Sequence, residues 1–283
     1  MISEMSVALS RFRLDFETTM KSIFNCSLPR TGLVLLFSSG AILLLTAAQR
    51  KEARVTQVVR DVKVLAPHVA ALPAQLNDNV TDGSAVHTGA DSRVELTFAD
   101  LTISRVGADS IFSFDQNGRN VTIESGAILL RVPRDSGGAR IRSSALTVGI
   151  SGTTVMFESH PRNYSKLIVL EGSSEAWLTK HPAKKITVHA GQMLVVKPGA
   201  MHLADPVDID ESLVLRTASL ITEFPPLPSL NLMRSVAADQ KKSGGPLLNP
   251  LVDPTGMGAR DVNASTRLQP TPHRTPGDGQ HKP

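Results

Sequence analysis

The stretch "ALTVGISGTTVMFES" at residues 145–159 decides how the middle of this chain folds. Its two halves, "LTVGI" and "TTVMFES", are short and rich in β-branched and apolar residues, which is typical of β-strands. Between them stands Ser151, with Gly149 two positions before it and Gly152 directly after it. Glycine adopts positive φ angles without steric cost, so the stretch predicts two strands joined at a sharp bend or bulge.

The same stretch argues against a serine hydrolase. The nucleophile elbow has the pattern Gly-x-Ser-x-Gly and leads into a helix. Here Gly152 comes one position too early, and a strand pattern follows it. The chain also lacks the Gly-x-x-x-x-Gly-Lys loop that holds phosphates and the Gly-x-Gly-x-x-Gly turn that holds dinucleotides. We therefore expect a protein that is not an enzyme, with no catalytic residues and no cofactor.

Strand patterns continue on both sides of this bend, from Val55 to about Pro198. In "RVELTF" at 93–98 the apolar residues Val94, Leu96 and Phe98 alternate with polar ones, as they do in a strand with one buried face. Similar runs follow, each closed by Gly, Asp, Asn, Ser or Pro. This pattern predicts an all-β fold, a compact rolled β-sandwich or a solenoid-like sheet of short strands.

An apolar run, "TGLVLLFSSGAILLLTAA", occupies residues 31–48. Basic residues precede it and it ends in small residues, as in an export signal cleaved after Ala48. Its length also suits a membrane-spanning signal anchor, and a buried core element is a third interpretation. The first two place the rest of the chain outside the cytoplasm, in the periplasm or cell envelope. The pattern leaves open whether translation starts at Met1 or Met20.

After the strands, Asp208 and Glu211 form a pair of the capping-box type ahead of "SLVLRTASLITEF". This predicts one short amphipathic helix that packs on the β domain or docks a partner and ends at "PPLP". The polar, Pro- and Gly-rich composition beyond it predicts disorder. The expected divisions are 1–48, signal peptide or anchor; 49–207, β domain; 208–230, helix and Pro-rich stop; 231–283, disordered tail.

Composition narrows the range of partners. Aromatic residues make up only 4% of the chain and the net charge is a mild +4, so we expect no nucleic-acid binding. Cys26 is the only cysteine, which rules out a disulfide framework and a zinc site built on several thiolates. The expected partner is a protein or a cell-envelope polymer, with membrane contact through the N-terminal segment if that segment stays uncleaved.

One alternative reading involves a metal. Gly152, Glu158, His160 and Gly172 approximate the spacing of the first metal-binding motif of cupins, and "KPGAMH" at 197–202 is weakly similar to the second. Glu158, His160 and His202 would be the ligands on a jelly roll. The leading prediction remains that the chain has no metal site, and a cupin-like metal-binding or carbohydrate-binding protein is the alternative.

The order of motifs over about 55–210 resembles the FecR domain family. The opening phrase lies in "LNDNVTDGSAVHTGADSRVELTFADLTISRVGADSIFSF" at 76–114. The residues that match it are Gly83, Thr88, Gly89, Ser92, Leu96, Phe98 and Asp100. The later steps are "VTIESGAILLRVP", "LTVGISGTTVMFE", "LIVLEGSSEAW" and "ITVHAGQMLVVKPG".

The resemblance implies an extracytoplasmic, non-catalytic β domain that binds other proteins, with an expected role in envelope signalling. In the namesake proteins the domain relays a signal to a cytoplasmic sigma factor through an anti-sigma domain of several dozen residues. Only about 30 residues precede the apolar run here, so we expect an exported single-domain version that lacks that domain. A transmembrane regulator of a sigma factor is the further alternative.

Overall fold

The computed structural model describes residues 53–250 apart from 68, 82 and 116–118. The segment 31–48 and the end of the chain beyond 250 lie outside the described residues. Within the described part, no helix is long and apolar enough to cross a membrane.

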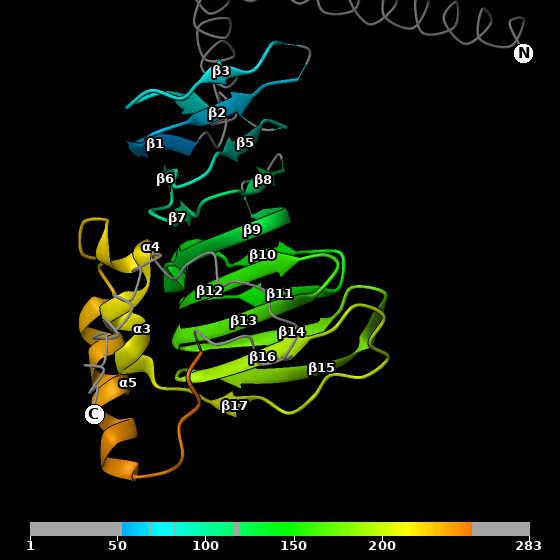
Figure 1. Ribbon diagram of the computed structural model, residues 1–283, viewed down its shortest axis with the longest axis vertical. Helices are drawn as coiled ribbons and strands as arrows, with labels where there is room; N and C mark the ends of the chain where they lie inside the picture. Colours follow the sequence, from blue (N-terminus) through cyan, green and yellow to red (C-terminus); the bar gives the residue numbers. More distant parts are fainter. Residues whose placement is uncertain (1–52, 68, 82, 116–118, 251–283) are drawn as a thin grey trace, which may run out of the picture. The chain divides into compact units, whose positions relative to one another are not determined.

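The strands form one continuous 17-stranded sheet that folds into two layers (Figure 1). The covered layer, over which the helices pack, contains β1 (Ala53–Val59), β4 (Asn79–Val80), β6 (Arg93–Phe98), β7 (Ile103–Val106), β12 (Thr153–His160), β13 (Tyr164–Glu171), β16 (Gln192–Val196) and β17 (Val207–Asp208). The open layer contains β2 (Val62–Leu65), β3 (Leu72–Pro73), β5 (Ala85–Thr88), β8 (Ile111–Phe114), β10 (Ala139–Arg142), β11 (Leu146–Ile150), β14 (Ser173–Leu178) and β15 (His181–His189). The all-β prediction is confirmed for the described residues.

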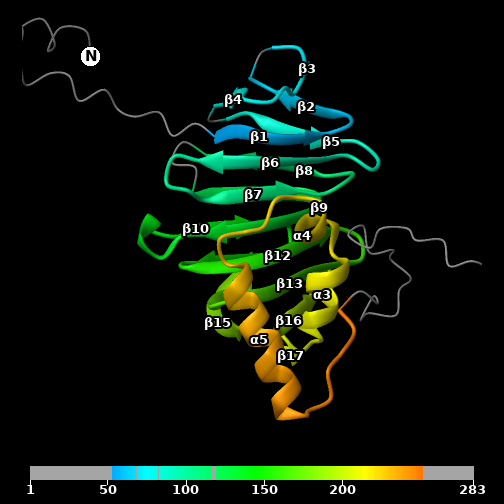
Figure 2. The same ribbon diagram turned by 90° about the vertical axis from the view of Figure 1, so that its left-hand side faces the viewer.

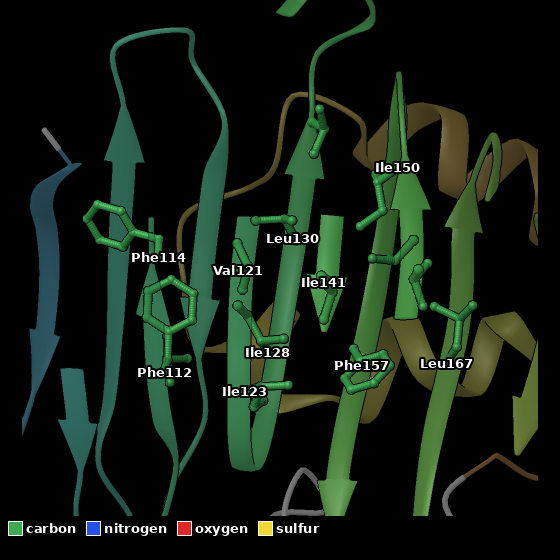
Figure 3. Packing of buried hydrophobic residues seen from close by; sticks show 14 of the residues in the cluster. Phe112, Phe114, Val121, Ile123, Ile128, Leu130, Ile141, Ile150, Phe157 and Leu167 are labelled. Atoms are coloured by element: carbon green, nitrogen blue, oxygen red, sulfur yellow. The ribbon is translucent and has the colours of Figure 1, made fainter. Parts of the chain in front are cut away.

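The long strand β9 (Asn120–Val132) belongs to both layers. Its first half pairs with β8 and β10 of the open layer, and its second half pairs with β7 and β12 of the covered layer. The change of layer occurs at Gly126, whose φ is 94°. Figure 3 shows Val121 and Ile123 on one arm of β9 and Ile128 and Leu130 on the other. A short 3-10 helix, η1 (Arg134–Ser136), follows the strand.

The stretch at 145–159 makes the same change of layer. β11 lies in the open layer and β12 in the covered layer, and Ser151 and Gly152 form the corner between them. Gly152 has φ 62° and Gly172, at the matching corner between β13 and β14, has φ 81°. A Cβ on Gly172 would lie 2.9 Å from the carbonyl oxygen of Gly152, so the two corners stack closely. The predicted bend is therefore confirmed.

The main core fills the space between the two layers. Phe112 of β8 and Phe157 of β12 are fully buried there, with the branched residues that Figure 3 labels. Phe98 and Phe114 meet edge to face, with ring centroids 5.1 Å apart. The predicted alternation of "RVELTF" is confirmed, because Val94, Leu96 and Phe98 all lie in this core.

Three helices form a third layer over the covered layer (Figure 2). They are α3 (Glu211–Thr217), α4 (Ser219–Thr222) and α5 (Leu230–Ser243). A second core joins them to the sheet, and Met156 of β12 and Met193 of β16 pack there with Val214 and Met233 of the helices. Because the outer face of these strands is also buried, all five residues of "TTVMF" at 153–157 are buried, and apolar and polar residues do not alternate there.

The helical layer corrects two expectations from the sequence. One amphipathic helix was expected at 208–230, but the segment folds as the two short helices α3 and α4, separated by the extended backbone of Ala218. Disorder was expected from residue 231, and this is wrong for α5. Only Met233 and Ala237 of α5 are buried, so its local apolar pattern is weak and its packing on the sheet stabilises it.

Arg105 of β7, in the covered layer of the sheet, anchors the helical layer to the sheet. Its guanidinium is fully buried and donates to the Glu95 carboxylate at 2.8 Å. It also donates to the carbonyl oxygens of Leu220 at 2.9 Å and Pro225 at 2.5 Å. Burial lowers the pKa of Arg105, while its hydrogen bond and charge contact with Glu95 act in the opposite direction. No local pattern around Arg105 predicts this anchor.

Glu211, the first residue of α3, is a buried carboxylic acid. Its side chain has no exposed surface, and neither carboxyl oxygen has a hydrogen-bond partner among the described residues. Burial raises the pKa of Glu211 from 4.5 to about 9. At neutral pH the folded protein therefore keeps a proton here that the unfolded chain releases.

We expect the protein to lose stability between about pH 5 and 9 because of Glu211. In this range the unfolded chain binds fewer protons than the folded one, so the free energy of unfolding falls as pH rises, by at most about 1.4 kcal/mol per pH unit. Urea titrations at several pH values would measure this slope. Glu211→Gln should flatten it between pH 6 and 8. An unchanged slope in this variant would contradict the assignment.

Candidate functional site

A groove of about 680 Å³ lies on the exposed face of the open layer. Its floor is formed by β10, β11, β14 and β15, which pair side by side in that order. Residues of these strands alternate between the core and the groove, so that Ile141, Val148 and Ala176 are buried while their chain neighbours face outward. The site is thus a direct product of strand periodicity.

Trp177, the only tryptophan, is half-buried in this groove. Its ring lies against Gly149 of β11, since a Cβ on that glycine would sit 3.5 Å from the ring. Gly149 thus has a second role besides the bend. Because it has no side chain, the indole can lie directly over its backbone. The strand supplies a flat aromatic surface at the base of a polar groove.

Positive charge surrounds the indole. The Lys185 ammonium lies 4.9 Å and the Arg140 guanidinium 5.7 Å from the ring centroid of Trp177, within the range of cation–π interaction. Lys185 also pairs with Glu175 at 2.9 Å, whereas Arg140 has no carboxylate at ion-pair distance among the described residues. Arg119 lines the same groove. The groove therefore has an excess of positive charge.

Hydroxyl groups complete the lining, from Ser151, Ser173 and Thr187. Ser151 is exposed at the corner, and the Thr153 side chain donates to its carbonyl oxygen at 3.0 Å. Within the part of the chain that the structure describes, no histidine lines the groove. An aromatic surface flanked by cations and hydroxyls suits the binding of an anionic or polar ligand.

The sequence candidates for a metal lie elsewhere. Glu158 is buried in β12, where its carboxylate pairs with Lys166 at 2.9 Å and accepts from the Tyr164 hydroxyl at 3.2 Å. His160 Nε2 lies 4.0 Å from the same carboxylate, and its ring contacts the Tyr164 ring at a tilt of 52°, with centroids 4.8 Å apart. Lys166 also donates to the carbonyl oxygen of Pro250 at 3.1 Å.

This arrangement does not resemble a metal centre. Lys166 occupies the position beside Glu158 that a cation would take, because an ammonium supplies the positive charge and only donates hydrogen bonds. His202 is exposed in the turn after β16. Over residues 53–250, with the gaps given above, no group of three or more His, Cys, Asp or Glu side chains could hold a metal ion. Glu158, His160 and His202 are therefore not assembled into a site.

Sequence reasoning missed the groove residues. The signal was present in "SSEAWL", where Glu175 and Trp177 alternate with buried Ser174 and Ala176. An outward-facing tryptophan on a strand is an unusual exposure of apolar surface, and such residues are frequent at binding sites. The strand order that brings Arg140 and Lys185 to its two sides cannot be read from that segment.

Residues 84–175 match the family model described as FecR protein. Two crystal structures of a proposed anti-sigma factor from Parabacteroides distasonis ATCC 8503 are similar to the chain at 15% sequence identity. One has a TM-score of 0.38 and the match covers 44% of this chain and 59% of that chain. The other has a TM-score of 0.40, with 47% and 64% covered.

The chain thus spans about three fifths of the length of these solved structures. No protein of curated function matches it. The family match confirms the resemblance drawn from the ordered motifs, and it begins at β5 and ends within β14. Residues 84–175, which carry Arg140 and Gly149 of the groove, are therefore a FecR-type segment.

Proposed function

We propose that this chain is a non-catalytic, extracytoplasmic interaction module of the FecR type. It binds a protein or a polymer of the cell envelope and serves envelope signalling. Its binding surface is the Trp177 groove. Export or anchoring by residues 31–48 brings it to the envelope.

The observation that carries this proposal is the indole of Trp177 set on Gly149 between Arg140 and Lys185. Tryptophan and arginine contribute most of the binding energy at many interfaces. Among the described residues, the groove offers hydroxyls but no serine paired with a histidine base, since Ser151 lies at a strand corner and the lining there contains no histidine. Binding is the function that these groups support.

Site-specific photo-crosslinking on the full chain tests the proposal. A benzophenone amino acid at Ser151 or Thr187 places the crosslinker in the groove, and the same residue at exposed Gln75, in the loop between β3 and β4, is the control. In cells that express the chain, we expect envelope adducts from the two groove positions and none from position 75. A discrete band would identify a protein, and a ladder would identify a polymer.

Trp177→Ala should reduce the yield of these adducts at least about tenfold, because the aromatic contact is lost. The far-ultraviolet circular dichroism should stay unchanged, since the indole lies on the outer face of the sheet and outside the core. Equal adduct yields with and without the indole, or adducts of equal yield at position 75, would refute the groove as the binding surface.

A further inference from the structure

The helical layer contains a second groove, between α3 and α4 on one side and α5 on the other. Its volume is about 500 Å³. Leu215, Ile221 and Phe224 line it with apolar side chains. This groove lies on the face of the fold that carries the helices, whereas the Trp177 groove lies on the open layer, and its elements follow the FecR-type segment in the chain.

Three exposed cations rim this apolar floor. Arg216 comes from α3, and Arg234 and Lys241 come from α5. None of the three has a carboxylate at ion-pair distance among the described residues. Because the cations come from both walls, positive charge flanks the apolar floor on its two sides.

Apart from Glu211, which is fully buried, the acidic residues of these helices and of their ends are engaged elsewhere. Glu223 pairs with Arg93 of β6 at 2.9 Å, and Asp239 pairs with Lys242 at 2.9 Å. Asp210 caps α3 by accepting from the backbone N–H of Leu213. The positive charge of the groove is therefore left without a counter-charge from its own helices.

We infer that this groove docks an acidic amphipathic helix of a partner protein. Along α5, Leu230, Arg234 and Lys241 fall on one stripe that spans about three turns, roughly 16 Å. A helix with one apolar face bordered by Asp or Glu complements an apolar floor bordered by cations, a recurring mode of helix-in-groove recognition. A second copy of this chain fits poorly, because its α5 would present Arg234 and Lys241 against the same positive charges.

Fluorescence anisotropy with the full chain tests this docking. The probe is a fluorescein-labelled peptide of about 15 residues with Leu at i, i+3, i+4 and i+7 spacing and Glu beside the Leu stripe. A second probe replaces every Glu with Lys, and a third scrambles the order of the first. We expect the acidic amphipathic peptide to bind, the other two to bind at least tenfold more weakly, and the affinity to fall as salt rises.

The charge-reversal variant Arg216→Glu/Arg234→Glu should weaken binding of the acidic peptide at least tenfold and strengthen binding of the Lys peptide. The matched control is Lys184→Glu/Lys197→Glu, which makes the same charge change at exposed sites outside the helices. It should leave both affinities within about twofold. If both variants lost the same affinity for the acidic peptide, the net charge of the chain alone would explain the loss. That result would overturn the inference.

Two further outcomes would also overturn it. Binding of all three peptides alike would show only apolar adhesion. Tighter binding to vesicles of anionic lipid than to the acidic peptide, lost in the same charge-reversal variant, would assign the groove to a membrane surface. Trp177→Ala should not alter peptide binding, so failure of this inference can be told apart from failure of the proposed function.

Discussion

Replacing Arg105 with Met should lower the free energy of unfolding by about 3–5 kcal/mol, the usual cost of breaking a buried ion pair by removing one partner. The substitution leaves the Glu95 carboxylate, which is 11% exposed, without its cation, and it strips a donor from the carbonyl oxygens of Leu220 and Pro225. The contact of the guanidinium with the Phe224 ring, 4.8 Å from its centroid, is lost as well. Urea denaturation followed by far-ultraviolet circular dichroism measures the change.

The chain offers a matched control in Arg93 of β6, whose guanidinium pairs with Glu223 at 2.9 Å. That pair is partly solvated, with side-chain exposures of 13% and 38%, so Arg93→Met should cost at most about 1 kcal/mol. The double variant Arg105→Met/Glu95→Gln should recover part of the loss, because the uncompensated charge is gone. If Arg105→Met were no more costly than Arg93→Met, Arg105 would not be the anchor of the helical layer.

Gly126→Ala should destabilise the fold by roughly 2–5 kcal/mol, the sum of the cost of positive φ and of overpacking. At φ 94°, a Cβ on residue 126 would lie 2.0 Å from Oγ and 2.6 Å from Cα of Ser110. Rotation of the Ser110 side chain cannot relieve the contact with its own Cα. The backbone of β9 must shift, at the point where the strand changes layer.

Gly199→Ala is the control for the backbone contribution. Gly199 also has positive φ, 74°, but a Cβ there would meet nothing within 4 Å. This variant should lose only about 1–2 kcal/mol. If Gly126→Ala is too unstable to purify, Ser110→Gly/Gly126→Ala removes two of the three clashing atoms and should restore a measurable melting transition. Equal melting temperatures for the Gly126 and Gly199 variants would disprove the steric argument.

The local pattern predicted much of the β fold. Short apolar runs marked the strands, and the buried alternation of Val94, Leu96 and Phe98 followed from strand periodicity alone. The bend at Ser151 was predictable because glycine is needed wherever φ turns positive. The resemblance to the FecR family rested on the order of such local pieces, and the family match covers 84–175.

The candidate sites were much less predictable. Glu158 and His160 suggested a metal because their types and spacing suited one, yet β13 places Lys166 against that carboxylate. In the Trp177 groove, the cations arrive from strands on either side of β14, and no local segment contains that order. The chemistry of both sites depends on residues that are close in space but come from different strands. The sequence shows directly only which residues are adjacent along the chain.

The sequence by itself determined the positions of the strands and of their glycine corners, because backbone sterics and strand periodicity act over a few residues. Only the tertiary structure decided which layer each strand joins, that Arg105 is buried, and that α5 is a helix. Arg105 meets Leu220 across 115 positions of chain, and α5 buries only Met233 and Ala237. The physical reason is that burial, ion pairing and the packing of a weakly amphipathic helix depend on partners that only the completed fold brings near.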